Sequence, residues 1–125
     1  MMRFTVLAGK GDYQAAYKLA EKVSDDNKSN ADLQNELAWR IATDPSLKER
    51  DLKLAEKIAR QANDATKAEN PMILDTLARV MFMQGNKDEA IALQEKAIAK
   101  IDGSEKESYV RTLESYKKGA LSKSN

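Results

Sequence analysis

The residues of this sequence that could carry out acid–base or metal chemistry are a few scattered carboxylates, among them Glu36, Asp75 and Glu114. The chain has no cysteine and no histidine, so thiol catalysis, disulfides and histidine-based proton transfer are excluded within it. Metal sites in helical bundles use glutamate–histidine pairs, which this composition cannot supply. Residues 9–11, Gly-Lys-Gly, lack the spacing and the preceding strand of a phosphate-binding loop. No intrinsic catalysis, cofactor or metal is therefore expected.

Binding chemistry is better represented, because aromatic and arginine side chains dominate the binding energy of many interfaces. Trp39 is the single tryptophan, and Arg79 belongs to a later segment with a similar pattern. Met72, Met81 and Met83 could supply an adaptable apolar surface. Their spacing places Met81 in the core and leaves Met72 and Met83 as candidates for exposure.

The overall composition restricts the possible partners. With 125 residues the chain is long enough for one domain with a core of its own. The formal net charge is +1 and no run of five like charges occurs, so no nucleic-acid partner is expected. The longest apolar run is too short for membrane insertion. Charged residues are abundant while glycine and proline are scarce, which favours long helices over a sandwich or barrel.

Apolar residues at three- and four-residue intervals predict an all-α fold. Helices are expected over about 13–25, 31–43, 52–62, 71–83, 87–101 and 104–119, with part of another over 3–10. Residues 46–50 are expected to form a charged connector, and 63–70 a loop. Asn86 with Glu89 and Ser104 with Glu107 have the spacing of capping boxes. The tail, 120–125, is expected to be disordered.

The predicted helices also repeat a common pattern. Leu37-Ala38-x2-Ile41 matches Leu77-Ala78-x2-Met81 in the first helix of each pair. In the second helices, Ala16-x3-Ala20, Ala55-x3-Ala59 and Ala90-x3-Gln94 align without gaps, and a glycine five residues before the first alanine occurs twice.

These residues resemble the tetratricopeptide repeat, in which small residues sit where paired helices cross closely. The resemblance implies an array of about 2.5 to 3 repeats within a single domain over 1–119. The repeats would cover about 3–28, 30–65 and 70–102, followed by a capping helix over 104–119. Departures from the motif are Gln94 where an aromatic is usual, the long connector at 46–50 and an incomplete first repeat.

A narrower resemblance rests on Asn35-Glu36-Leu37-Ala38-Trp39 and on residues 74–79, Leu-Asp-Thr-Leu-Ala-Arg. This combination is similar to the helical-repeat region that follows thioredoxin-like domains in some bacterial cell-envelope proteins. It implies an accessory domain or fragment of a larger protein, which could itself be an oxidoreductase. The implied setting is the periplasm or cell envelope, with the cytoplasm as the alternative.

In such arrays the first helices line a groove that holds a peptide or a partner helix. The groove candidates are Asn35, Trp39, Asp75, Arg79 and Phe82. Some members of the family hold a C-terminal carboxylate with a lysine and an asparagine, but the corresponding positions here have no lysine. The expected partner is a protein or peptide segment, which this chain would bind without such a carboxylate clamp.

Two alternatives remain open from the residues alone. Trp39 and Arg79 could simply pack between neighbouring first helices instead of contacting a partner. The chain could also be a structural spacer, or could self-associate weakly through its N-terminal end, where Phe4, Val6 and Leu7 lack a full helical partner.

Overall fold

The computed structural model describes residues 12–45, 47–48 and 50–120. These residues form six α-helices and no strands. The all-α prediction is therefore confirmed for this part of the chain. The predicted helical segment at 3–10, with Phe4, Val6 and Leu7, and nearly all of the predicted tail lie outside the described residues. The helices are α2 (Tyr13–Asp26), α3 (Ala31–Thr43), α4 (Leu52–Ala65), α5 (Pro71–Met83), α6 (Lys87–Lys100) and α7 (Glu105–Lys117).

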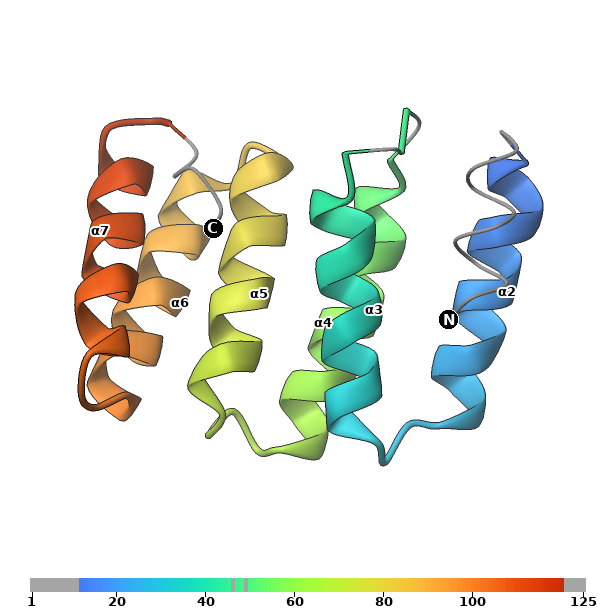
Figure 1. Ribbon diagram of the computed structural model, residues 1–125, viewed down its shortest axis with the longest axis horizontal. Helices are drawn as coiled ribbons and strands as arrows, with labels where there is room; N and C mark the ends of the chain where they lie inside the picture. Colours follow the sequence, from blue (N-terminus) through green and yellow to red (C-terminus); the bar gives the residue numbers. More distant parts are fainter. Residues whose placement is uncertain (1–11, 46, 49, 121–125) are drawn as a thin grey trace.

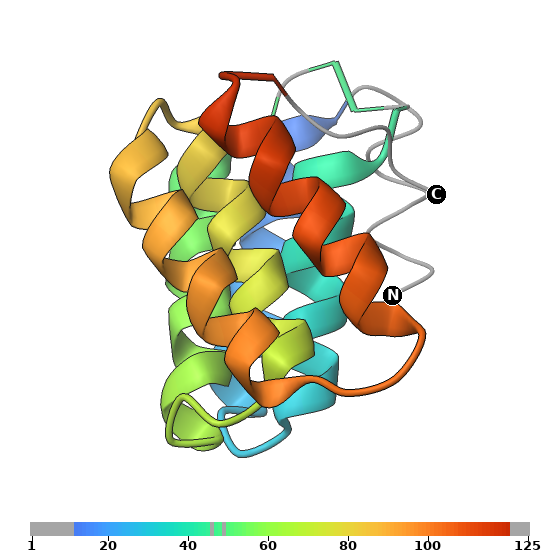
Figure 2. The same ribbon diagram turned by 90° about the vertical axis from the view of Figure 1, so that its left-hand side faces the viewer.

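The helices lie side by side and follow one another across the molecule (Figure 1). α3 packs closely on α4, and α5 packs closely on α6. These two hairpins meet where α5 contacts both α3 and α4, while α7 covers α6 at one end and α2 adjoins α3 and α4 at the other. Figure 2 shows α4 and α6 toward one side of the molecule and α3 toward the other. Because α3 and α5 are in contact, their outward faces lie next to each other.

Small side chains allow the helices of each hairpin to approach closely. The alanines on the inner faces are fully buried: Ala16, Ala20, Ala38, Ala55, Ala59, Ala62, Ala78, Ala90 and Ala97. Leucine and isoleucine fill the space between neighbouring helices, led by Leu37, Ile41 and Leu77. This packing supplies the main stabilising term, about 1.5–3 kcal/mol for each fully buried large apolar side chain.

Four helices begin at residues whose side chains cap the first turn. The side-chain oxygens of Asp12, Asn30, Asp51 and Asn70 each accept a hydrogen bond from a backbone N–H in the first turn of α2, α3, α4 and α5. Each such cap contributes about 1 kcal/mol. Pro71 occupies the first turn of α5, where its missing N–H costs no hydrogen bond.

Both predicted capping boxes are wrong. Asn86 and Ser104 precede α6 and α7, but neither side chain forms a capping hydrogen bond. Glu89 instead accepts a hydrogen bond from Arg60 of α4 at 2.9 Å. Glu107 pairs with an arginine one turn further along α7. In both cases a cation within reach competes successfully with the backbone for the carboxylate.

The segment predicted as a loop at 63–70 is partly helical, because α4 continues to Ala65. The helix then ends through Lys67 and Ala68, which have positive φ values of 55° and 60°. The N–H of Ala68 donates to the carbonyl oxygen of Asn63 at 2.9 Å and so closes the helix end. Left-handed backbone usually requires glycine, so the sequence did not indicate this termination.

The connector between α3 and α4 is more than a charged linker. Leu47 is only 5% exposed and belongs to the core. The Arg50 guanidinium donates to the carbonyl oxygens of Ile41 at 2.7 Å and Asp44 at 2.9 Å. The connector thus satisfies carbonyl groups that would otherwise be unpaired at the C-terminal end of α3.

Candidate functional site

Trp39 of α3 and Arg79 of α5 come together on the neighbouring faces of their helices. The Arg79 Cζ atom lies 5.6 Å from the centroid of the Trp39 ring, and both residues are half-buried. A cation over an indole face is attracted by about 0.5–2 kcal/mol. The pair therefore forms a partly exposed contact between the two hairpins.

The guanidinium of Arg79 has unused hydrogen-bonding capacity. Its Nε atom is buried and has no acceptor among the described residues, and Arg79 forms no ion pair with any of them. Arginine carries five donors in a planar fork that suits carboxylate and phosphate groups. An arginine held in place with open donors can bind an anion without first releasing a partner.

Asp75, one turn before Arg79, lies beneath α7 instead of on an open surface. Its Oδ1 atom accepts a hydrogen bond of 2.9 Å from Gln94 of α6. Gln94 is fully buried and also donates to the Tyr109 carbonyl oxygen of α7 at 3.3 Å. Burial raises the pKa of Asp75, while the Gln94 hydrogen bond and the charge of Arg79 act in the opposite direction. Gln94 therefore links Asp75 of α5 to α7, and the half-buried Asp75 carboxylate is only partly accessible to a partner.

Phe82 is also partly covered by α7. Its ring stacks on that of Tyr116, with centroids 4.6 Å apart and an interplanar angle of 20°. Tyr116 is 1% exposed, and this burial raises the pKa of its hydroxyl. Burial, the largest cause, also raises the pKa of the half-buried Tyr109 to about 12.

Asn35 lies one turn before Trp39 on α3. It is half-buried, and its Oδ1 atom is buried without a donor among the described residues. Of the five predicted groove residues, the structure thus brings Trp39 and Arg79 into contact and places Asn35 on the same helix as Trp39. It places Asp75 and Phe82 against α7.

The methionines divide between core and surface. Met81 is 4% exposed and belongs to the core, as predicted. Met83 is half-buried against the core, while Met72 is 52% exposed. Met72 is the exposed large hydrophobic residue among those described, at the start of the face that carries Arg79.

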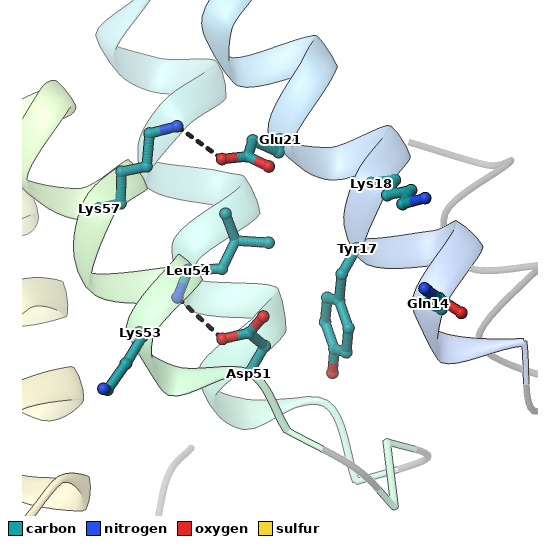
Figure 3. Close-up of a pocket in the computed structure, with 8 residues that line it drawn as sticks. All are labelled: Gln14, Tyr17, Lys18, Glu21, Asp51, Lys53, Leu54 and Lys57. Carbon is teal, nitrogen blue, oxygen red and sulfur yellow. Dashed lines mark hydrogen bonds and ion pairs between the residues drawn. The ribbon is translucent and has the colours of Figure 1, made fainter.

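A concave feature that the sequence did not indicate lies between α2 and α4 (Figure 3). This α2/α4 cleft has a volume of about 550 Å³. Tyr17 and Leu54 line it from opposite helices, and burial raises the pKa of Tyr17. No periodicity could have indicated the cleft, because it depends on the distance between two helices. Its lining residues are Gln14, Tyr17, Lys18, Glu21, Asp51, Lys53, Leu54 and Lys57.

The carboxylates considered for chemistry do not converge. Glu36 pairs with Arg40 of its own helix at 3.6 Å, Asp75 bonds to Gln94, and Glu114 is exposed on α7. Within the part of the chain that the structure describes, no three acidic residues are grouped as a metal site. None of the described helices has the length and apolar character needed to cross a membrane.

Over the described residues these features define an all-α protein whose candidate site lies on the neighbouring helices α3 and α5. No model of a known protein family matches the chain, and no curated protein or solved structure shows significant similarity to it.

Proposed function

We propose that this chain is a helical-repeat module that binds a protein or peptide segment on the face formed by α3 and α5. The observation that carries the proposal is Arg79, a half-buried arginine stacked on Trp39 with no hydrogen-bond acceptor for its Nε among the described residues. Leaving a buried donor unsatisfied costs about 1–3 kcal/mol. The buried Nε is closed to a ligand, but the other donors of this half-buried guanidinium are not among the buried atoms, so the site favours a ligand that supplies an acceptor to them.

The repeat assignment is supported by the burial of aligned positions. Ala16, Ala55 and Ala90 align in α2, α4 and α6, and each is 0% exposed. The next aligned set, one turn later, is equally buried and includes Gln94. In the first helices, the Leu-Ala pairs at 37–38 and 77–78 are buried in the same way. We therefore interpret the α3/α4 and α5/α6 hairpins as tetratricopeptide-like repeats, with α7 as the capping helix.

The chemistry of the site favours an acidic segment. Arg79 is a cation whose charge acts on the carboxylate of Asp75, and that carboxylate is already bonded to Gln94. A glutamate, an aspartate or a C-terminal carboxylate of the partner could form a bidentate pair with the guanidinium. The indole of Trp39 would provide an adjacent apolar contact.

The resemblance to regions appended to thioredoxin-like domains suggests where such binding would be used. On this proposal the chain presents or recruits substrates for a catalytic domain elsewhere in a larger bacterial envelope protein. Coding sequence upstream that contains a Cys-x-x-Cys thioredoxin pattern would support this context, and an unrelated upstream sequence would contradict it.

The binding proposal can be tested with a displayed library of random dodecapeptides selected on the immobilised chain. Selected peptides should be enriched in aspartate and glutamate. Their affinity, measured by fluorescence anisotropy, should fall by about tenfold or more in Arg79→Met, because a charge-assisted contact is lost. Trp39→Ala should weaken binding as well.

A matched control is Arg111→Met, which removes an exposed arginine of α7 whose ion-pair partner is Glu107 of the same helix. This variant should bind the selected peptides with unchanged affinity. If the double variant Trp39→Ala/Arg79→Met binds them as tightly as the unaltered chain, the assignment of the site is wrong.

A further inference from the structure

The link between α6 and α7 contains Asp102-Gly103, the one aspartate–glycine pair in the chain. α6 ends at Lys100 and α7 begins at Glu105, so the pair belongs to neither helix. Both residues of the pair are exposed, whereas Ile101 immediately before them is only 7% exposed. The link is therefore anchored in the interior at one end, and the pair itself is open to water.

The backbone N–H of Gly103 is unpaired among the described residues. The carbonyl oxygen of Gly103 accepts a hydrogen bond of 3.2 Å from the N–H of Lys106, but the Gly103 N–H donates to none of these residues. Gly103 has a φ of 79°, which glycine adopts without strain. Apart from its neighbours in the chain, no described residue has an atom within 4 Å of the position that a Cβ would occupy. No side chain therefore blocks access to this nitrogen.

The side chain of Asp102 carries a carbonyl carbon that this nitrogen can attack. The Gly103 nitrogen is separated from the Asp102 Cγ by the carbonyl carbon, Cα and Cβ of Asp102, so attack closes a five-membered ring. The Asp102 carboxylate forms no hydrogen bond or ion pair with a described residue that would hold it away from the backbone. Both reacting groups are thus unengaged within the part of the chain that the structure describes.

Asp64 provides a comparison within the same chain. It is exposed and is followed by the small, exposed residue Ala65, but both residues lie within α4. The backbone N–H groups of an α-helix are bonded to the carbonyl oxygens four residues earlier. A nitrogen held in this way is not positioned to attack the preceding side chain. The reaction is therefore expected at Asp102 and not at Asp64.

We propose that Asp102-Gly103 is a site of spontaneous isoaspartate formation in the link between α6 and α7. The Gly103 nitrogen forms a bond to Cγ of the protonated Asp102 carboxyl group, and the proton of the nitrogen and the hydroxyl of the carboxyl group leave as one water molecule. The product of this step is a cyclic succinimide. The site is separate from the Trp39–Arg79 contact and does not depend on the function proposed for it.

A second water molecule then opens the succinimide at one of its two carbonyl groups. Opening at Cγ restores aspartate. Opening at the former backbone carbonyl leaves the chain running through the side chain of Asp102, with one carbon more in the backbone and a free carboxylate on Cα. The link between Ile101 and α7 is then one carbon longer.

The test is to incubate the full chain at physiological temperature and pH and to digest samples with trypsin at intervals. Trypsin releases residues 101–106 as one peptide and residues 61–67, which contain Asp64, as another. Liquid chromatography with mass spectrometry separates the isoaspartate peptide from the aspartate peptide of equal mass and detects the succinimide as a peptide lighter by one water. We expect isoaspartate to accumulate in the 101–106 peptide several-fold faster than in the 61–67 peptide.

Two variants at the exposed Asp102 examine the chemistry. Asp102→Glu keeps the charge but would require a six-membered ring, so the isomer should be lost. Asp102→Asn should form isoaspartate several-fold faster, because a neutral amide is attacked more readily than a carboxyl group that is mostly ionised. Unaltered circular dichroism should show that both variants retain the fold.

The proposal is overturned if the 101–106 peptide of the original chain gains no isoaspartate, or gains no more than the 61–67 peptide does. It is also overturned if Asp102→Asn forms none. Equal accumulation of the isomer in Asp102→Glu would overturn it as well, because the isomer would then arise at another residue of the peptide.

Discussion

Tyr116 should determine whether α7 stays attached to the rest of the protein. It is the one fully buried side chain of α7, and its ring stacks on Phe82 of α5. Replacing a buried aromatic residue with alanine costs about 3–5 kcal/mol, which includes the lost transfer free energy and the cavity left behind. Tyr116→Ala therefore removes the largest single contribution to the docking of α7.

The remaining contacts of α7 cannot compensate for that loss. The hydrogen bond from Gln94 to the Tyr109 carbonyl oxygen is 3.3 Å long, and an ordinary hydrogen bond contributes about 1 kcal/mol net. The other apolar residues of its inner face, Tyr109, Val110 and Leu113, are only half-buried. A helix of 13 residues is marginal in water by itself. α3 to α6 share a core of their own, so α7 should detach without unfolding them.

Hydrogen exchange with mass spectrometry measures this directly. In Tyr116→Ala the amides of Glu105–Lys117 should exchange nearly as fast as in an unfolded chain, while those of α3 to α6 stay protected. Tyr116→Phe keeps the stacked ring and should retain protection of α7. The reasoning is refuted if α7 remains protected in the alanine variant, or if α3 to α6 lose their protection together with it.

Three further predictions concern charge, a buried hydroxyl and backbone strain. Burial raises the pKa of Asp75, so the folded state keeps the Asp75 carboxyl protonated to a higher pH than the unfolded chain does. The contribution of Asp75 to the unfolding free energy therefore grows as the pH falls through that raised pKa. Urea denaturation should show that the stability of Asp75→Asn relative to the original chain declines from neutral pH to about pH 3; a constant or rising difference would contradict this. Ser24→Ala removes a buried hydroxyl that bonds to glutamine amides of α3 and α4, and should lower the unfolding free energy by about 1–3 kcal/mol, whereas Ser29→Ala on the exposed surface should change it little. Ala68→Gly should raise the urea midpoint by relieving the positive φ of 60°, a gain of about 1 kcal/mol after the added freedom of the unfolded chain; a lower midpoint would show that Ala68 is not strained.

The candidate site was only partly predictable. The spacing of Trp39 and Arg79 within their similar helices was enough to expect them near each other, because both occupy corresponding faces. The covering of Asp75 and Phe82 was not predictable, since it depends on the path of α7 across α5 and α6. Gln94 was visible as a departure from an aromatic pattern, but its hydrogen bond to Asp75 appears only when α5 and α6 are placed together.

Local signals in the sequence determined the helices themselves. Apolar periodicity, Pro71, and the caps at Asp12, Asn30 and Asp51 act within one or two turns, so they need no tertiary information. The tertiary structure decided the features that depend on distances between helices: the partner of Glu89, the burial of Leu47, the α2/α4 cleft and the open donors of Arg79. A side chain with several possible partners bonds to the one that lies within reach, and which groups lie within reach across helices is fixed only by packing.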